Sequence, residues 1–186
     1  MGGLGIDRFI ALYRGINVGG ANPVKMDSLR AMHEQLGHRD VANYIQSGNI
    51  VFAAAGAQAE NLARKIEARF AKEFGFSARV MVVAAARWKT LLRDNPYSAL
   101  SAKDPKRVHA GVCDGEPSAK GLKALLEKTG GSESFMFKSG VIYLHAPDGV
   151  GNSKFAAGME KACGVPITMR NWRTVEAIGG LLDASE

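Results

Sequence analysis

The residues best suited to chemistry lie in a glycine-rich loop near the N-terminus. Residues 14–20 (RGINVGG) follow an apolar run and precede a helical pattern, and Lys25 stands just before that pattern. The glycines could let backbone N–H groups approach an anion at the helix N-terminus, where the helix dipole favours negative charge. Arg14 and Lys25 would add positive charge. In the alternative, the glycines only supply the positive φ of a tight connection.

A second polar set lies at the tip of a predicted hairpin. Residues 44–49 (YIQSGN) separate two short apolar runs. Gln46, Ser47 and Asn49 carry groups that could bind a ligand. Ser, Gly and Asn are also the ordinary residues of a hairpin turn, so the segment by itself fits either interpretation.

A third polar set comes from two segments near the C-terminus. Residues 147–154 (PDGVGNSK) precede a predicted helix, and residues 168–174 (TMRNWRT) end a predicted strand. Lys154 and Arg170 could bind an anion, while Trp172 offers a ring for stacking. In the alternative, Trp172 lies in the core and the arginines are solvated.

Catalytic motifs are scarce. The sequence has no HExxH or HxxxH spacing, no GxSxG elbow and no paired carboxylates. Cys113 could pair with a histidine as nucleophile and base. We expect His109 and His145 to face the same open side of a sheet as Tyr143, and His33 to lie at or near the surface. The sequence leaves enzymatic activity undecided and predicts no metal and no cofactor.

The elements that must position these residues follow one order twice. Apolar periodicity and turn residues predict strand, helix, hairpin, helix and strand. In the first half these elements span residues 9–14, 26–36, 41–52, 59–74 and 79–83, with an extra helix over 85–93. In the second half they span residues 107–113, 118–128, 134–144, 152–162 and 167–170, with a final helix over 174–182.

Matching positions in the two halves are separated by nearly constant offsets. Leu29 and Leu122 are 93 positions apart, the turn residues Ser47 and Ser139 are 92 apart, and the helix-closing Gly75 and Gly164 are 89 apart. We therefore predict an α+β fold made by tandem duplication of a ferredoxin-like βαββαβ module. Each copy carries an extra C-terminal helix and the copies pack as one unit, with halves at residues 1–97 and 98–186.

This topology brings the polar sets together in pairs. The first and second strands of a module run the same way, so the glycine loop and the first hairpin tip should lie at one end. The two C-terminal segments should share one end of the second half, and with opposed halves the two ends could form one composite cleft. The predicted ligand-binding residues are Arg14, Asn17, Gly19, Gly20, Lys25, Gln46, Ser47, Asn49, Lys154, Arg170, Asn171 and Trp172.

Composition gives a mild bias toward an anionic partner, and a solvated basic surface is the more ordinary explanation of the charge. The 186 residues include 24 Lys and Arg against 18 Asp and Glu, a net charge of +6, but the basic residues are scattered. Cys113 and Cys163 form no CxxC pair, which is typical of a reducing cytoplasm. No signal peptide or stretch of about 20 apolar residues is visible, so we expect a cytoplasmic protein that does not enter membranes.

The aromatic residues of the second half raise a rival function. Arg107, His109, Phe135, Phe137 and Tyr143 on an open sheet face would resemble an RNA-binding surface. A non-catalytic protein-interaction module is a third alternative. The leading hypothesis is a protein that binds, and could act on, a small anionic, phosphate-bearing ligand. The sequence does not determine the ligand or the oligomeric state.

Several blocks resemble a known family. Residues 11–20 (ALYRGINVGG), 44–49 (YIQSGN), 95–97 (NPY) and 168–175 (TMRNWRTV) are similar to blocks of the bacterial domain of unknown function 1697 family. The family pattern usually has Thr at Met169 and Asn at Arg173, which weakens any role for those two side chains. The resemblance implies a duplicated ferredoxin-like fold and brings no established activity, substrate or catalytic residue.

Overall fold

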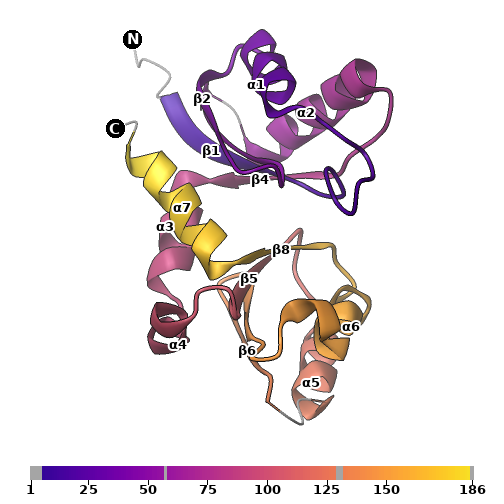
Figure 1. Ribbon diagram of the computed structural model, residues 1–186, viewed down its shortest axis with the longest axis vertical. Helices are drawn as coiled ribbons and strands as arrows, with labels where there is room; N and C mark the ends of the chain where they lie inside the picture. Colours follow the sequence, from indigo (N-terminus) through magenta and orange to yellow (C-terminus); the bar gives the residue numbers. More distant parts are fainter. Residues whose placement is uncertain (1–5, 57, 129–131, 185–186) are drawn as a thin grey trace. The chain divides into compact units, whose positions relative to one another are not determined.

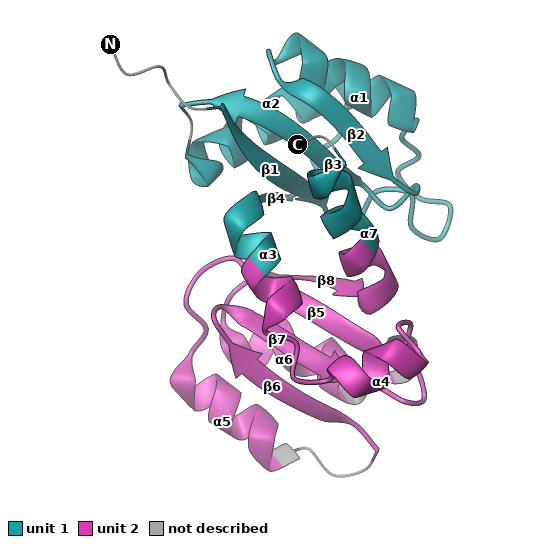
Figure 2. Cartoon of the chain, turned by 90° about the vertical axis from the view of Figure 1, so that its left-hand side faces the viewer, with its two compact units in different colours: residues 1–89, 177–186 teal, residues 90–176 magenta. Residues whose placement is uncertain are grey.

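The chain divides into two units. The computed structural model describes residues 6–56, 58–128 and 132–184 (Figure 1). Unit 1 comprises residues 1–89 and 177–186, and unit 2 comprises residues 90–176 (Figure 2). The divisions fall inside two helices, α3 (Ala85–Arg93) and α7 (Trp172–Asp183). The sequence-based boundary after residue 97 and the packing of the halves stay predictions.

Unit 1 has the predicted βαββαβ order. Its elements are β1 (Ile6–Tyr13), α1 (Met26–Gln35), β2 (Arg39–Tyr44), β3 (Asn49–Ala55), α2 (Ala59–Phe74) and β4 (Val80–Ala84). The sheet order is β2-β3-β1-β4, and every neighbouring pair is antiparallel. Right-handed crossovers in the predicted module place its first and third strands at the centre of the sheet, and β1 and β3 are central here. With both helices on one face, this is the ferredoxin-like arrangement (Figure 1).

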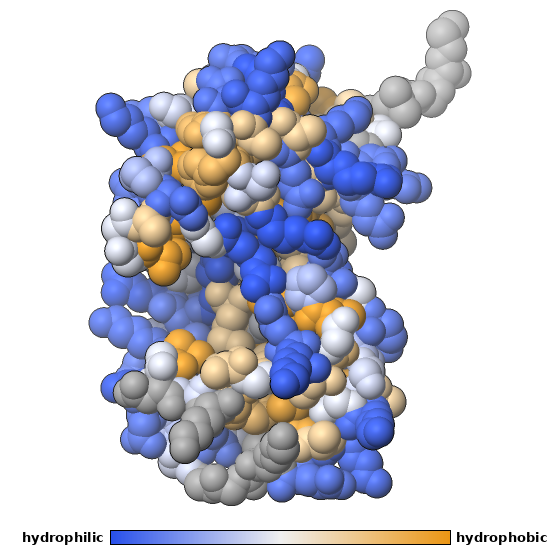
Figure 3. Space-filling model, turned by 90° about the vertical axis from the view of Figure 1, so that its right-hand side faces the viewer, coloured by the Kyte–Doolittle hydropathy of each residue, from blue (hydrophilic) through white to orange (hydrophobic). Residues whose placement is uncertain are grey.

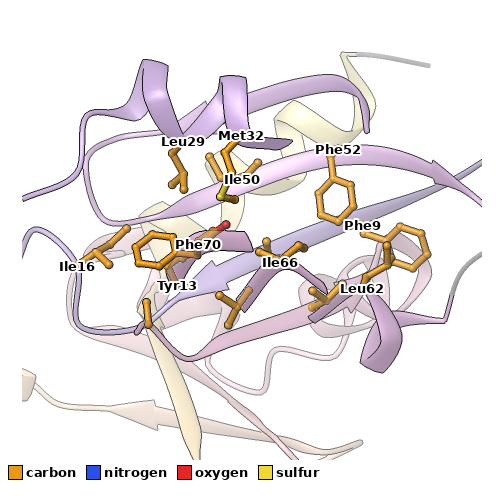
Figure 4. Packing of buried hydrophobic residues seen from close by; sticks show 14 of the residues in the cluster. Phe9, Tyr13, Ile16, Leu29, Met32, Ile50, Phe52, Leu62, Ile66 and Phe70 are labelled. Carbon is orange, nitrogen blue, oxygen red and sulfur yellow. The ribbon is translucent and has the colours of Figure 1, made fainter. Parts of the chain in front are cut away.

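Alternation along β1 creates the core between this sheet and its helices. Phe9, Ala11 and Tyr13 share the face that packs against α1 and α2, because side chains two apart on a strand point the same way. The helices α1 and α2 pack against this face through apolar residues spaced three and four apart (Figure 4). These are Leu29 and Met32 of α1, and Leu62, Ile66 and Phe70 of α2. Each fully buried side chain of this size contributes about 1.5–3 kcal/mol.

The opposite face of this sheet is buried as well. Ile10, Leu12, Val51 and Val83 are each at most 1% exposed, as expected for strands that are apolar at both parities. The C-terminal part of α7 belongs to unit 1. It is joined to the rest of the unit by an ion pair from Lys89 Nζ to Asp183 Oδ1 at 3.3 Å.

Unit 2 repeats the same topology. Its elements are α4 (Ser98–Lys103), β5 (Val108–Cys113), α5 (Ala119–Lys128), β6 (Ser134–Lys138), β7 (Val141–His145), the 3-10 turn η1 (Val150–Asn152), α6 (Lys154–Cys163) and β8 (Ile167–Asn171). The sheet order is β6-β7-β5-β8. The helix α4 lies between the predicted helix over 85–93 and the predicted strand over 107–113, where the sequence predicts no helix. The sequence predicts that Gly130 and Gly131 cap the helix over 118–128, and these two glycines lie outside the described residues.

A shared hydrogen bond supports the duplication. The N–H of Tyr13 donates to Gly48 O at 2.8 Å, and the N–H of Cys113 donates to Gly140 O at 3.1 Å. Each bond ties the end of a first strand to its hairpin turn, so Tyr13 and Cys113 occupy equivalent positions. In the part of the chain that the structure describes, no helix has the length and apolar character needed to cross a membrane.

Candidate anion-binding site

Asn17 joins the glycine loop of unit 1 to the hairpin tip. Its Nδ2 donates to Gln46 O at 2.8 Å and to Val24 O at 2.9 Å. Its Oδ1 accepts from the N–H of Val24 at 2.7 Å. The backbone of Asn17 has φ 54°, a left-handed conformation that asparagine tolerates better than most residues. The prediction that the loop and the tip lie at the same end of the module is confirmed.

A second asparagine closes the loop on itself. Asn22 Nδ2 donates to Gly15 O at 2.9 Å, and Asn22 O accepts from the N–H of Asn17 at 3.1 Å. Gly19 and Gly20 are exposed, have φ 57° and 80°, and have open space where a Cβ would stand. The positive φ of these two glycines accounts for their presence in the loop, whether or not they contact a ligand.

The hairpin tip is packed tightly on the end of β1. Asn49 is buried, and its Nδ2 donates to Tyr44 O at 3.2 Å and to Ser47 Oγ at 2.8 Å. At Gly48, which has φ 69°, an added Cβ would stand 2.6 Å from Tyr13 Cβ. Asn49 and Ser47 therefore shape the turn, and Gln46 is the exposed polar side chain of the predicted set.

A groove of about 520 Å³ lies where the loop meets the N-terminus of α1. It is lined by Asn17, Pro23, Val24, Lys25, Met26, Asp27 and Gln46. Lys25 occupies the N-cap position and makes no side-chain cap hydrogen bond. On the side of unit 1 that carries this loop, apolar surface is bordered by hydrophilic residues (Figure 3).

Three of the predicted binding residues of unit 1 line the groove: Asn17, Lys25 and Gln46. Arg14 is half-buried and does not line the groove, and its N–H donates to Arg79 O at 3.0 Å. Asp27, which was not predicted, also lines the groove. Its Oδ1 pairs with Arg30 Nη2 at 2.6 Å, so its charge is compensated by a neighbour on the same helix.

The predicted residues of unit 2 hold local structure together. Asn171 Oδ1 accepts from the N–H of Thr174 at 2.9 Å, which caps α7. Trp172 is buried, and its Nε1 donates to Glu176 Oε1 at 2.9 Å. Arg170 Nη1 donates to Met169 O at 3.0 Å. The burial of Trp172 supports the core alternative for its ring. The side chain of Lys154 lies outside the described residues, and a role for this set in binding stays a prediction.

The prediction that His109 and Tyr143 share a sheet face is wrong. His109 stands opposite Leu144, while Tyr143 stands opposite Ala110, and directly opposed residues share a face. His109 therefore lies on the side of the sheet that α5 and α6 cover. It is four residues from Cys113 along β5, about 13 Å. His145 lies on the other face, so the strand register does not support the predicted Cys–His pair.

The rival RNA-binding surface is divided between the two faces in the same way. Phe135 and Phe137 stand opposite Leu144 and Ile142, on the helix-covered face. On the other face, the C-terminal end of α3 and the residue after it contact the sheet: Tyr143 donates its hydroxyl to Leu91 O at 3.0 Å, and Lys138 Nζ pairs with Asp94 Oδ2 at 3.6 Å. The prediction of an aromatic platform on an open face of the sheet is therefore wrong.

Sequence reasoning missed a chain of polar side chains in the core of unit 1. Tyr13 Oη and His33 Nε2 are 2.8 Å apart, and the Nδ1 atoms of His33 and His38 are 2.9 Å apart. Burial, followed by the charge of His38, lowers the pKa of His33 to about 3. Burial and then Lys65 lower the pKa of His38 to about 4. The placement of His33 near the surface is wrong, because it is fully buried.

Two ferredoxin-like repeats in one chain, with a loop–helix groove in the first, define a duplicated α+β protein. The chain belongs to the family described as "Protein of unknown function (DUF1697)", whose model matches residues 6–143. The match ends in β7, so the C-terminal blocks at residues 147–154 and 168–175 lie beyond it. The described residues contain no group of three or more His, Cys, Asp or Glu that could hold a metal ion.

The fold is also similar to a solved bacterial structure. The chain is 27% identical to the conserved bacterial protein SP0830 from Streptococcus pneumoniae, with a TM-score of 0.71. The likeness covers 96% of this chain and 99% of that one. A search of curated proteins finds no match.

Proposed function

We propose that the chain binds a small anionic, phosphate-bearing ligand in the groove of unit 1. The observation that carries this proposal is the N-terminus of α1, which has no side-chain cap and borders the groove. The first N–H groups of a helix have no acceptor within the helix, and the dipole places partial positive charge there. Phosphate oxygens are suitable acceptors for such N–H groups.

The charges of the groove lining agree with an anionic ligand. Lys25 is exposed at the N-cap position, and Asp27 is the acidic residue of the described lining. Because Asp27 is paired with Arg30, its charge is largely offset and Lys25 is left to attract an anion. Pro23, Val24 and Met26 offer apolar surface to the rest of a ligand. The groove volume falls within the roughly 300–1,000 Å³ typical of small-molecule sites.

The proposal is limited to binding. A reaction would need a nucleophile or a general base near the ligand. In the described lining, the candidate for a base is Asp27, whose carboxylate is already paired with Arg30. Action on the ligand therefore stays a prediction from the sequence.

The sharpest test adds one negative charge to the groove without changing its shape. Gln46→Glu is isosteric, and it leaves the backbone carbonyl that Asn17 binds in place. We would titrate the labelled protein with pyrophosphate and phenyl phosphate at constant ionic strength and follow amide NMR shifts. We expect shifts at residues 25–28, and at least about fivefold weaker binding by Gln46→Glu, equivalent to about 1 kcal/mol.

The matched control is Gln58→Glu. Gln58 is the N-cap residue of α2, also without a side-chain cap hydrogen bond, and it does not line the groove. This variant should bind both probes like the wild type. Equal weakening by the two variants would show that only net charge matters. An unchanged spectrum at residues 25–28 with both probes would overturn the proposal.

A further inference from the structure

The Tyr13–His33–His38 chain connects three elements of unit 1. Tyr13 ends β1, His33 lies in the last turn of α1, and His38 precedes β2. All three side chains are buried, at 1%, 0% and 8% exposure. The ring of His38 stacks on Phe52 of β3 at 4.2 Å between centroids. The hydrogen bonds of the Tyr13–His33–His38 chain therefore hold the C-terminal end of α1 to the centre of the sheet.

The hydrogen bond between His33 and His38 depends on how many protons the two imidazoles carry. A neutral imidazole has one donor and one acceptor nitrogen, so the Nδ1–Nδ1 bond needs one ring to donate and the other to accept. One added proton can be accommodated if the direction of the chain reverses and His38 donates to His33. A second proton makes both Nδ1 atoms donors, and the bond between His33 and His38 is lost.

We propose that the Tyr13–His33–His38 chain is an acid-sensitive latch that holds α1 on the sheet of unit 1 and releases it when both histidines are protonated. The inference needs no ligand. Because Met26 and Asp27 of α1 line the groove, release would also dismantle that site. The latch is tested by amide exchange without any ligand, whereas anion binding is tested by titration, so failure of one proposal is distinguishable from failure of the other.

The surroundings of the pair favour the neutral state at neutral pH. Among the described residues, the titratable and charged groups that face it are Tyr13 from β1 and Lys65 from α2. Burial raises the pKa of Tyr13, so its hydroxyl stays protonated. A positive Lys65 opposes protonation of His38. From β3 and α2, the aromatic rings of Phe52 and Phe70 contact the chain and supply no counter-charge.

Among the described residues of unit 2, other residue types stand where unit 1 has Tyr13 and His33. The backbone bond to the hairpin turn makes Cys113 the counterpart of Tyr13, and the sequence repeat sets Leu126 against His33. The helix–sheet interface of unit 2 is therefore an internal comparison in every experiment on the intact chain.

Amide hydrogen exchange at several pH values tests the latch. We would measure protection factors, corrected for intrinsic exchange, between pH 6.5 and pH 3. As pH falls from about 6.5 toward 4, we expect α1 of the wild type to lose about tenfold or more in protection and to stay less protected than β3, while α5 keeps most of its protection. In His33→Gln/His38→Gln, which cannot take up these protons, α1 should keep its protection.

Further variants keep the test decisive. His38→Gln leaves an amide oxygen that can accept from His33, and it should move the loss of α1 protection to lower pH. His145→Gln removes a histidine of unit 2 and should behave like the wild type. The proposal is overturned if α1 is as strongly protected as β3 at every pH, or if the double variant loses α1 protection at the same pH as the wild type.

Discussion

The Nδ1 atoms of His33 and His38 lie 2.9 Å apart in the interior of unit 1, five residues apart in the sequence. The two rings are 5.0 Å apart between centroids and tilted by 53°, so they meet through their nitrogens and do not stack on each other. Burial lowers the pKa of both imidazoles to well below 7, so both are neutral at neutral pH. Their neutrality links the stability of unit 1 to pH.

We expect unit 1 to become less stable as pH falls from about 6.5 toward 4. The folded-state pKa values, about 3 for His33 and about 4 for His38, lie below the unfolded value of about 6.5. The unfolded chain then binds more protons, so stability is complete above pH 6.5 and is lost as pH falls. Two histidines contribute a slope of about 2–3 kcal/mol per pH unit between pH 6 and 4.

Urea unfolding at several pH values measures this slope. The double variant His33→Gln/His38→Gln removes both groups, so the difference between its slope and that of the wild type isolates the histidines from carboxylates that titrate in the same range. Parallel pH dependences in the two proteins would contradict the buried neutral pair.

Asn17 should contribute more to stability than an ordinary loop residue. Its side chain makes three hydrogen bonds to backbone groups of Val24 and Gln46. Asn17→Gly keeps the left-handed backbone accessible and removes those bonds, at a cost of about 2–3 kcal/mol. Asn17→Ala adds the strain of a non-glycine residue at φ 54° and should cost about 1 kcal/mol more. Urea midpoints of both variants check the order.

If Asn17→Gly lowers the free energy of unfolding by less than about 0.5 kcal/mol, Asn17 does not stabilise the joint between the glycine loop and the hairpin tip. Asn61→Gly is an unsuitable comparison because Asn61 lies inside α2. Asn43→Ala on β2 is better, since Asn43 accepts one hydrogen bond from Arg30 and does not line the groove. It should cost less than either variant of Asn17.

The repeated fold was accessible from sequence because it depends on local periodicity. The helix at residues 59–74 was predicted with the bounds that α2 has, since its apolar residues recur at helical spacing and Gly75 ends it. The meeting of the glycine loop and hairpin tip followed from strand direction alone. The bond from Asn17 to Gln46 O spans 29 residues, and no local pattern specifies such a partner.

The errors arise where burial depends on distant partners. His33 lies four residues after Leu29, on the same helical stripe, yet a histidine enters a core only if its nitrogens are paired. That pairing required Tyr13, 20 residues earlier. The face of His109 was misassigned because the register of β5 and β7 was unknown. Side chains alternate between faces, so a register difference of one residue moves every side chain to the other face.

The hydroxyl of Tyr143 should stabilise the end of α3. It donates to Leu91 O at 3.0 Å, and Leu91 lies in the last turn of that helix, where carbonyls lack a partner within the helix. Burial, and then the charge of Asp94, raise the pKa of Tyr143 to about 12, so the hydroxyl remains a donor. Tyr143→Phe should cost about 1–2 kcal/mol in urea unfolding. Tyr97→Phe, at a half-buried tyrosine of the same unit, should cost less, and equal losses would contradict this role.

Gly121 should be the least replaceable glycine of the helix layer in unit 2. A Cβ added there would stand 1.8 Å from Ala162 O, so the backbones of α5 and α6 meet at this glycine. Gly121→Ala must push the two helices apart, and we expect it to destabilise the unit by about 3 kcal/mol or more.

Gly158→Ala is the matched control, because Gly158 lies in α6 with open space around the added Cβ. That change should stabilise the chain by up to about 1 kcal/mol, since alanine favours helix more than glycine does. Thermal unfolding of both variants decides the matter: similar melting temperatures would show that the two helices do not meet at Gly121.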